Sequence, residues 1–223
     1  NNWEGNEPSR LSKTLSILKP IASECGISLA DTIVLAGNSA VEEAAKAAGY
    51  NLDVPFKSGR GDASQEMTDE NSFSNLEPLA DGYRNWIDSK YSNNAEEMML
   101  DKTQLLGLTA PEMTVLLAGM RMLNVNTRGT QYGVLTKTPG KLTNDYFINL
   151  LDMNTKWEPS SDSENLFEGI DRDSGDVKWT ATRTDLIFGS NSQLRAIAEV
   201  YATKNSLEKF IKDFYKVWFK VMN

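Results

Sequence analysis

The apolar residues of this chain recur mostly at intervals of three and four, and this periodicity restricts its fold more than any other feature. One such row, between Pro8 and Glu24, consists of Leu11, Leu15, Leu18 and Ile21. A repeat near 3.6 residues places these side chains on one face of an α-helix. Pro20 lies inside the stretch, and proline removes a backbone donor and clashes with the preceding turn. We therefore predict a helix over 8–24 that Pro20 kinks or ends early.

Helix-start signals divide much of the remaining chain into further helices. Ser28 followed by Asp31, and Thr109 followed by Glu112, have the spacing of a capping box. The first pair predicts a helix that stops at Gly49, and the second predicts a helix that runs through residue 123. The apolar period also predicts helices over 96–106, 142–153, 192–202 and 207–222.

Two stretches lack the helical period. Residues 51–93 are rich in Gly, Pro, Ser, Asn and Asp, so we expect an ordered, irregular connection with short helices near 79–91. Residues 166–170 and 177–181 flank Asp173-Ser174-Gly175, which is the strongest β-hairpin signal in the chain. No internal repeat or domain boundary separates these segments. The sequence therefore predicts a single, mostly α domain over residues 1–223 with a small β-hairpin.

Charge and composition exclude several classes of function. The chain has 23 basic and 31 acidic residues, a net charge of −8, and no basic cluster interleaved with aromatic residues. Nucleic acid and anionic membrane are therefore poor partners. The longest apolar runs, 32–36 and 113–118, are far too short to span a bilayer. One cysteine, no N-glycosylation sequon and no signal-peptide pattern lead us to expect a cytoplasmic protein.

The chain has no histidine, so it cannot hold a histidine-ligated haem or zinc ion. Cys25 stands at the end of a predicted helix without a basic neighbour, and we interpret it as an inert, partly buried thiol. A metal site or a glycosidase pair built only from carboxylates stays open, although no spacing singles out a pair. Motif chemistry alone identifies no active site.

Three local patterns have a functional and a structural interpretation, and we favour the structural one in each. Arg60-Gly61-Asp62 is an adhesion tripeptide, which arises by chance in many chains without a secretion signal. The segment 171–176 resembles a calcium loop, but Gly175 stands where a ligand belongs and no Glu follows at the twelfth position. A turn explains it better. The third pattern is an apolar row near the C-terminus, which we interpret as core packing and not as a partner groove. Its members are Phe210, Ile211, Phe214, Val217, Trp218 and Val221.

Several strings, taken together, resemble the C-terminal half of bacterial-type catalase-peroxidases. In chain order they are Trp3-Glu-Gly-Asn-Glu-Pro8, Ser28-Leu-Ala-Asp-Thr-Ile-Val-Leu-Ala-Gly37, Gly59-Arg-Gly-Asp-Ala63, Leu108-Thr-Ala-Pro-Glu-Met113, Leu142-Thr-Asn-Asp-Tyr-Phe-Ile-Asn-Leu-Leu-Asp-Met153, Val177-Lys-Trp-Thr-Ala-Thr-Arg183 and Phe188-Gly-Ser-Asn-Ser-Gln-Leu-Arg195. The resemblance covers nearly the whole chain. It implies a haem-peroxidase-like helical fold and a protein of two tandem peroxidase domains, of which the C-terminal copy is a degenerate duplicate. Since the chain begins at Asn1 without an initiator Met, we expect a fragment that lacks the first helices of this copy.

The resemblance also assigns three vestigial haem-site positions. Arg121, in Ala118-Gly-Met-Arg-Met-Leu-Asn124, stands where the active copy has its iron-ligating histidine. The proximal tryptophan position falls on Leu135, and the proximal aspartate position falls on Asp185. A guanidinium has no lone pair for iron. We therefore expect no haem and no catalytic, cofactor-binding or metal-binding residue in this chain.

For the full protein, the resemblance implies hydrogen peroxide decomposition and peroxidase activity with haem b in the N-terminal domain. This chain would then support that haem domain and the subunit contacts of a homodimer. The alternative is a stand-alone protein-interaction domain that descended from a peroxidase.

Arg121 and Asp185 are expected to pair with each other. A buried carboxylate without a partner costs several kcal/mol, so an ion pair that fills the space of the lost haem is the natural compensation. The competing interpretation is that Arg121 extends to solvent and Asp185 only caps the following helix. A separation well beyond about 4 Å would reject the pair.

Overall fold

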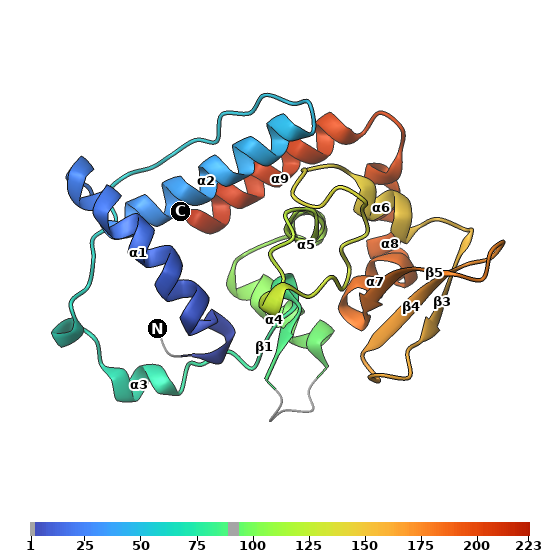
Figure 1. Ribbon diagram of the computed structural model, residues 1–223, viewed down its shortest axis with the longest axis horizontal. Helices are drawn as coiled ribbons and strands as arrows, with labels where there is room; N and C mark the ends of the chain where they lie inside the picture. The colour runs from blue at the N-terminus through green and yellow to red at the C-terminus, as the bar shows by residue number, and fades with distance from the viewer. Residues whose placement is uncertain (1–2, 89–93) are drawn as a thin grey trace.

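The computed structural model describes residues 3–88 and 94–223, and it shows a mostly helical chain with two small antiparallel sheets (Figure 1). The helices are α1 (Pro8–Cys25), α2 (Leu29–Ala47), α3 (Glu70–Ser74), α4 (Ala95–Leu105), α5 (Ala110–Met122), α6 (Asp145–Leu150), α7 (Arg183–Ser190), α8 (Ser192–Ala202) and α9 (Leu207–Met222). The strands are β1 (Ala80–Asp81), β2 (Trp86–Ile87), β3 (Thr155–Pro159), β4 (Leu166–Asp171) and β5 (Val177–Thr182). The predicted fold class is confirmed. No helix within the described ranges is long and apolar enough to cross a membrane.

Helix α5 lies at the centre of the core. Nine of its 13 residues are buried, so it needs neighbours on nearly every side. Helices α6, α8 and α9 supply them, and Figure 1 shows α5 almost end-on with α2 and α9 running past it. The predicted aromatic row of α9 is core, because Phe210, Phe214 and Val217 are buried and Trp218 packs against the same cluster.

The contact between α5 and α9 depends on Gly119. A Cβ atom at this position would lie 2.1 Å from the ring of Phe214, which has no exposed surface. The absence of a side chain therefore allows the phenyl ring to lie directly on the α5 backbone.

The prediction that Pro20 ends α1 early is wrong. The helix continues to Cys25 and stops at Gly26, whose φ of 65° is left-handed. Proline removes one hydrogen bond, here to the carbonyl of Ser16, and Ser16 is exposed so that water can bond that carbonyl. Cys25 is also exposed rather than partly buried, because this end of α1 extends into solvent.

The prediction of short helices near 79–91 is wrong for most of the described part of that range. Two short strands, β1 and β2, pair there around a single 3-10 turn, Gly82–Arg84. The Asp81 carboxylate caps the turn by accepting the N–H of Tyr83 at 3.1 Å, and Asn85 ends it with a φ of 51°. The short helix of this connection, α3, lies earlier, and it was not predicted. Tyr91 lies outside the described residues.

The predicted hairpin is confirmed, and it belongs to a three-stranded sheet of order β3-β4-β5. Its turn uses the Asp171 carboxylate, which accepts the N–H groups of Asp173 and Ser174 at 2.9 and 3.0 Å. Gly175 has a φ of 79°, which glycine adopts without strain. These contacts give the turn interpretation its physical basis. The strand β3 and the helix α7 were not predicted.

The tripeptide Arg60-Gly61-Asp62 forms hydrogen bonds with the start of α2 and the end of α9. The Asp62 carboxylate accepts the first N–H groups of α2, from Leu29 and Ala30, at 2.8 and 2.9 Å. Arg60 donates to the Asp31 carboxylate at 2.9 Å and to the carbonyl of Met222, near the end of α9, at 2.7 Å. These contacts favour the structural interpretation of the motif.

The predicted capping box at the start of α2 is half formed. Ser28 Oγ accepts the N–H of Asp31 at 3.0 Å, as expected. The Asp31 carboxylate does not return to Ser28; it accepts the N–H of Gly59 at 2.9 Å instead. The N–H of Gly59, followed by the Arg60 guanidinium, holds the pKa of the Asp31 carboxyl below its usual value.

Replacing Asp62 by alanine should lower the free energy of unfolding by about 1 kcal/mol, the usual effect of losing an N-terminal helix cap. Urea denaturation of the 223-residue chain measures this change. Asp53→Ala is the matched control, because Asp53 is an exposed aspartate of the same connection. Equal stability of the two variants would contradict the capping role.

Candidate functional site

Arg121 is a fully buried arginine in the last turn of α5. Its Nε donates to Asp185 Oδ1 at 2.8 Å, and neither side chain has any exposed surface. The predicted ion pair is therefore confirmed, and the interpretation in which Arg121 extends to solvent is wrong.

The rest of the guanidinium is also hydrogen-bonded. Nη1 donates to the carbonyl of Tyr83 at 2.7 Å and to Asn126 Oδ1 at 3.3 Å, and Nη2 donates to the carbonyl of Gly82 at 2.8 Å. Four of the five N–H bonds of Arg121 thus have partners. A buried charge is stable only when hydrogen bonds replace its hydration. Two of the four acceptors here are carbonyls of the short turn between β1 and β2.

Asp185 joins this ion pair to the start of α7. Its Oδ2 accepts the N–H of Thr182 at 2.9 Å and lies 2.9 Å from Thr182 Oγ1, which forms a capping box. The capping role in the competing interpretation is therefore also correct, and one carboxylate serves both purposes. Asn85 Nδ2, at 3.5 Å, adds a long contact to the same oxygen.

A glycine makes room for the Asp185 carboxylate. Gly133 has a φ of 73°, and a Cβ atom there would lie 2.4 Å from the carboxyl group of Asp185. Its N–H donates to the carbonyl of Thr180 in β5 at 2.8 Å. The segment after α5 therefore reaches the β5–α7 junction through a residue that needs both a positive φ and no side chain.

Leu135 does not belong to the polar cluster of Arg121 and Asp185. It is fully buried in the main apolar core and offers only aliphatic surface, while its carbonyl accepts Asn149 Nδ2 at 2.8 Å. The structure thus joins two of the three predicted positions, Arg121 and Asp185, in one polar cluster. It places the third in the apolar packing.

Tyr146 was not predicted to belong to the cluster. Its hydroxyl donates to the carbonyl of Asp185 at 3.2 Å. Burial, and next the negative charge of Asp185, raise the pKa of Tyr146 well above its usual value, so the phenol stays protonated. Asn85 and Asn126 were also missed, because contacts between distant segments leave no local pattern. Thr182 could have been found, since Thr182-Arg-Thr-Asp185 has capping-box spacing.

No group in this cluster suits a metal or haem iron. The guanidinium has no lone pair, the Asp185 oxygens already accept hydrogen bonds, and the Tyr146 phenol is protonated. Across residues 3–88 and 94–223, no three Cys, Asp or Glu side chains gather closely enough to hold a metal ion. Hydrogen bonds within the cluster already occupy both Asp185 oxygens and four of the five N–H bonds of Arg121.

Comparisons with known proteins agree with the resemblance. The pattern of the family described as "Peroxidase" matches residues 1–204. A catalase-peroxidase of Alkalilimnicola ehrlichii is 64% identical over 222 residues, and one of Halorhodospira halophila is 62% identical over 222 residues. The match covers 100% of this chain but 30% of each of these two proteins. A catalase-peroxidase of Aeromonas salmonicida is 62% identical, with 32% of its length covered. The chain therefore spans about a third of the length of the curated relatives it matches.

Proposed function

The chain belongs to the peroxidase family, and from this premise we propose that it is the haem-free domain of a catalase-peroxidase. In this proposal the full protein decomposes hydrogen peroxide and oxidises donors in an N-terminal domain that carries haem b. The present domain supports that active domain and the contacts of a homodimer. The share of the relatives that it covers favours one domain of a longer protein over a stand-alone interaction domain.

The buried Arg121–Asp185 pair is the observation that carries the proposal. An iron ligand at this position would require the guanidinium to leave. Its departure would leave the Asp185 carboxylate without its counterion and the carbonyls of Gly82 and Tyr83 without their donor. An unsatisfied buried polar group costs about 1–3 kcal/mol, and a charged group costs more. The pair therefore supports a domain that has exchanged cofactor binding for a rigid polar core.

A haem titration tests the proposal directly. The 223-residue chain should give no Soret band that saturates at one haem per chain, and it should release no oxygen from peroxide. Its exposed apolar residues can adsorb haem loosely, so stoichiometry and not colour is the criterion. Saturation at one haem per chain with peroxide turnover would reject a haem-free domain.

The supporting role needs a second arm of the same experiment. The haem domain produced without these residues should lose most of its catalase activity, and the separately produced 223-residue chain should restore part of it by shifting the population toward the competent state. A Leu15→Glu chain, changed at a half-buried position of α1, should restore less activity than an Ile17→Glu chain, changed at an exposed position of the same helix. Full activity of the haem domain alone would favour the stand-alone interaction domain.

A further inference from the structure

A cavity of about 220 Å³ lies between the three-stranded sheet and the helices α7 and α8, which are neighbours in Figure 1. None of its lining residues belongs to the Arg121–Asp185 cluster. Its walls include the apolar side chains of Leu150, Trp157 and Leu186 and the charged side chains of Asp152, Arg172 and Arg195. We call these six residues and the space between them the α7–β3 cavity.

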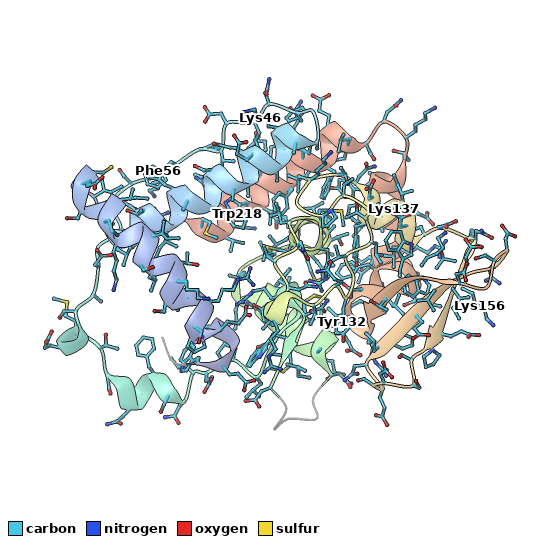
Figure 2. The ribbon with its side chains drawn as sticks, in the orientation of Figure 1. Lys46, Phe56, Tyr132, Lys137, Lys156 and Trp218 are labelled. Atoms are coloured by element: carbon cyan, nitrogen blue, oxygen red, sulfur yellow. The ribbon has the colours of Figure 1, made fainter. Side chains whose placement is uncertain are left out.

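Strand β3 presents an indole ring to this cavity. Figure 2 shows Lys156 of β3 at the outer edge of the molecule. Lys156 forms an ion pair with Glu158, two residues later, so both side chains point to the outer face of the sheet. Successive side chains of a strand point to opposite faces, and Thr155 and Trp157 accordingly line the cavity. The sheet therefore forms one wall of the cavity and α7 forms another.

Arg172 differs from the other arginines of the chain. Within the described residues, each of the other seven pairs with a carboxylate, and these are the arginines at positions 10, 60, 84, 121, 128, 183 and 195. Arg172 has no such partner there, although the chain has 31 acidic residues. Its Nε donates to the carbonyl of Met153 at 3.0 Å, which leaves both Nη groups without an acceptor among these residues. The guanidinium is thus held in place with two donor groups open.

Arg195 adds a second guanidinium from the helical side of the cavity. Its Nη1 donates to the carbonyl of Gly189 at 3.1 Å, and its Nε donates to Glu199 at 3.0 Å. Its Nη2 has no acceptor within residues 3–88 and 94–223. Gly189 and Met153 both line the cavity, so each guanidinium is anchored to the backbone of the cavity wall.

Asp152 is the one carboxylate of the cavity lining within the described residues, and its charge is already balanced. It accepts the N–H of Asn154 at 2.9 Å, the hydroxyl of Thr155 at 3.1 Å and the ammonium of Lys178 at 3.2 Å. With two guanidiniums and one carboxylate, the lining carries a net positive charge in a chain of net charge −8. The cavity therefore favours an anion and disfavours a metal cation.

The shape and walls of the cavity restrict which anion fits. A guanidinium binds a carboxylate or a phosphate through two parallel hydrogen bonds. The apolar walls favour an anion with an apolar body, as in most sites for small molecules. The volume of about 220 Å³ is below the roughly 300–1,000 Å³ of sites for drug-sized ligands, so a nucleotide is too large. A small organic carboxylate meets all three conditions.

We propose that the α7–β3 cavity binds a small organic monocarboxylate. Its carboxylate accepts hydrogen bonds from the open Nη groups of Arg172 and Arg195, and its apolar body lies against Trp157 and Leu186. The inference goes beyond the proposed function and does not rest on it, because neither haem nor peroxide enters the argument.

A fluorine NMR titration of the 223-residue chain, labelled with fluorotryptophan, tests the site with benzoate as the probe. The signal of Trp157, assigned with Trp157→Phe, should shift and saturate at about 1–10 mM benzoate. The signals of Trp3, Trp86 and Trp218, which do not line the cavity, should stay in place. Without a saturable shift at Trp157 the proposal is wrong.

Two further probes separate the charge of the ligand from its apolar body. Benzamide has nearly the same shape but no charge, so it should bind at least about tenfold more weakly than benzoate. Inorganic phosphate has charge but no apolar body, and it should leave the Trp157 signal in place. Equal affinity for benzamide would overturn the role of the arginines, and an equal response to phosphate would show a site for inorganic anions instead.

Variants of the two arginines complete the test. Arg172→Gln should weaken benzoate binding by at least about tenfold. Arg10→Gln removes the same charge from an exposed arginine of α1 that does not line the cavity, so its affinity should equal that of the parent. Arg195→Gln should act as Arg172→Gln does, which keeps the test valid if either variant fails to fold. Equal affinity of the Arg172→Gln and Arg10→Gln chains would overturn the proposal.

Discussion

Replacing Arg121 by methionine is expected to lower the free energy of unfolding of the 223-residue chain by roughly 3–5 kcal/mol. The substitution leaves the Asp185 carboxylate in a site without solvent, with only the Thr182 cap and a long Asn85 contact to stabilise its charge. It also removes the donors of the Gly82 and Tyr83 carbonyls. Urea denaturation measures the change. Lys212→Met is the control, because it breaks an exposed ion pair with Glu208 and should cost less than about 1 kcal/mol.

A double-mutant cycle separates the ion pair from the other roles of its members. Asp185→Leu alone loses both the pair and the cap of α7, so it should cost at least as much as Arg121→Met. The double variant should cost less than the sum of the two single variants by about 2 kcal/mol, because no unpaired charge stays buried. It should not regain full stability, since the α7 cap and the two carbonyls still lack partners. Additive effects would show that Arg121 and Asp185 do not stabilise each other.

Replacing Gly119 by alanine is expected to destabilise the chain by about 2 kcal/mol or more, although alanine favours helices by about 1 kcal/mol over glycine. The new methyl group would overlap the Phe214 ring, and that ring is fully buried and has no free space to enter. Thermal unfolding should show a fall in Tm of at least about 4 °C for a chain of this length.

Gly189→Ala is the matched control for this change. Gly189 is also a helical glycine, but its nearest neighbour would be Leu150 at 3.4 Å, so alanine should be neutral or slightly stabilising there. Adding Phe214→Leu to Gly119→Ala should recover part of the loss by vacating the contested space. A Gly119→Ala chain as stable as the parent would mean that α5 and α9 are not in the contact described.

The sequence predicts helix bounds correctly where a long amphipathic period is the only local signal. The bounds of α8 and α9 are confirmed at both ends, because both helices have a long amphipathic period. Helix α7 follows β5 without a connecting loop, so its apolar period does not separate it from the strand before it. The capping-box spacing of Thr182 and Asp185 is the only local signal of its start. The prediction of short helices near 79–91 fails for another reason. The Asp81 side chain caps the turn and Asn85 has a positive φ, so the chain turns within three residues.

The candidate site, like the fold, was predicted in part. The family resemblance placed Arg121 and Asp185, and the cost of a buried charge then predicted their pairing. The remaining partners of Arg121 are mainly backbone carbonyls at 82 and 83, which any residue provides, so no sequence pattern marks them.

The Arg121–Asp185 cluster also has a consequence for how the chain folds. Its members come from the end of α5, the turn at 82–84 and the β5–α7 junction, so its contacts join residues 38, 39 and 64 positions apart. Any intermediate that docks α5 before the other two segments arrive would enclose a guanidinium without its counterion. Such species are high in energy, and closing long loops is slow. We therefore expect these three segments to assemble late and together, which would make the transition between unfolded and native chains sharper than its helical content alone suggests.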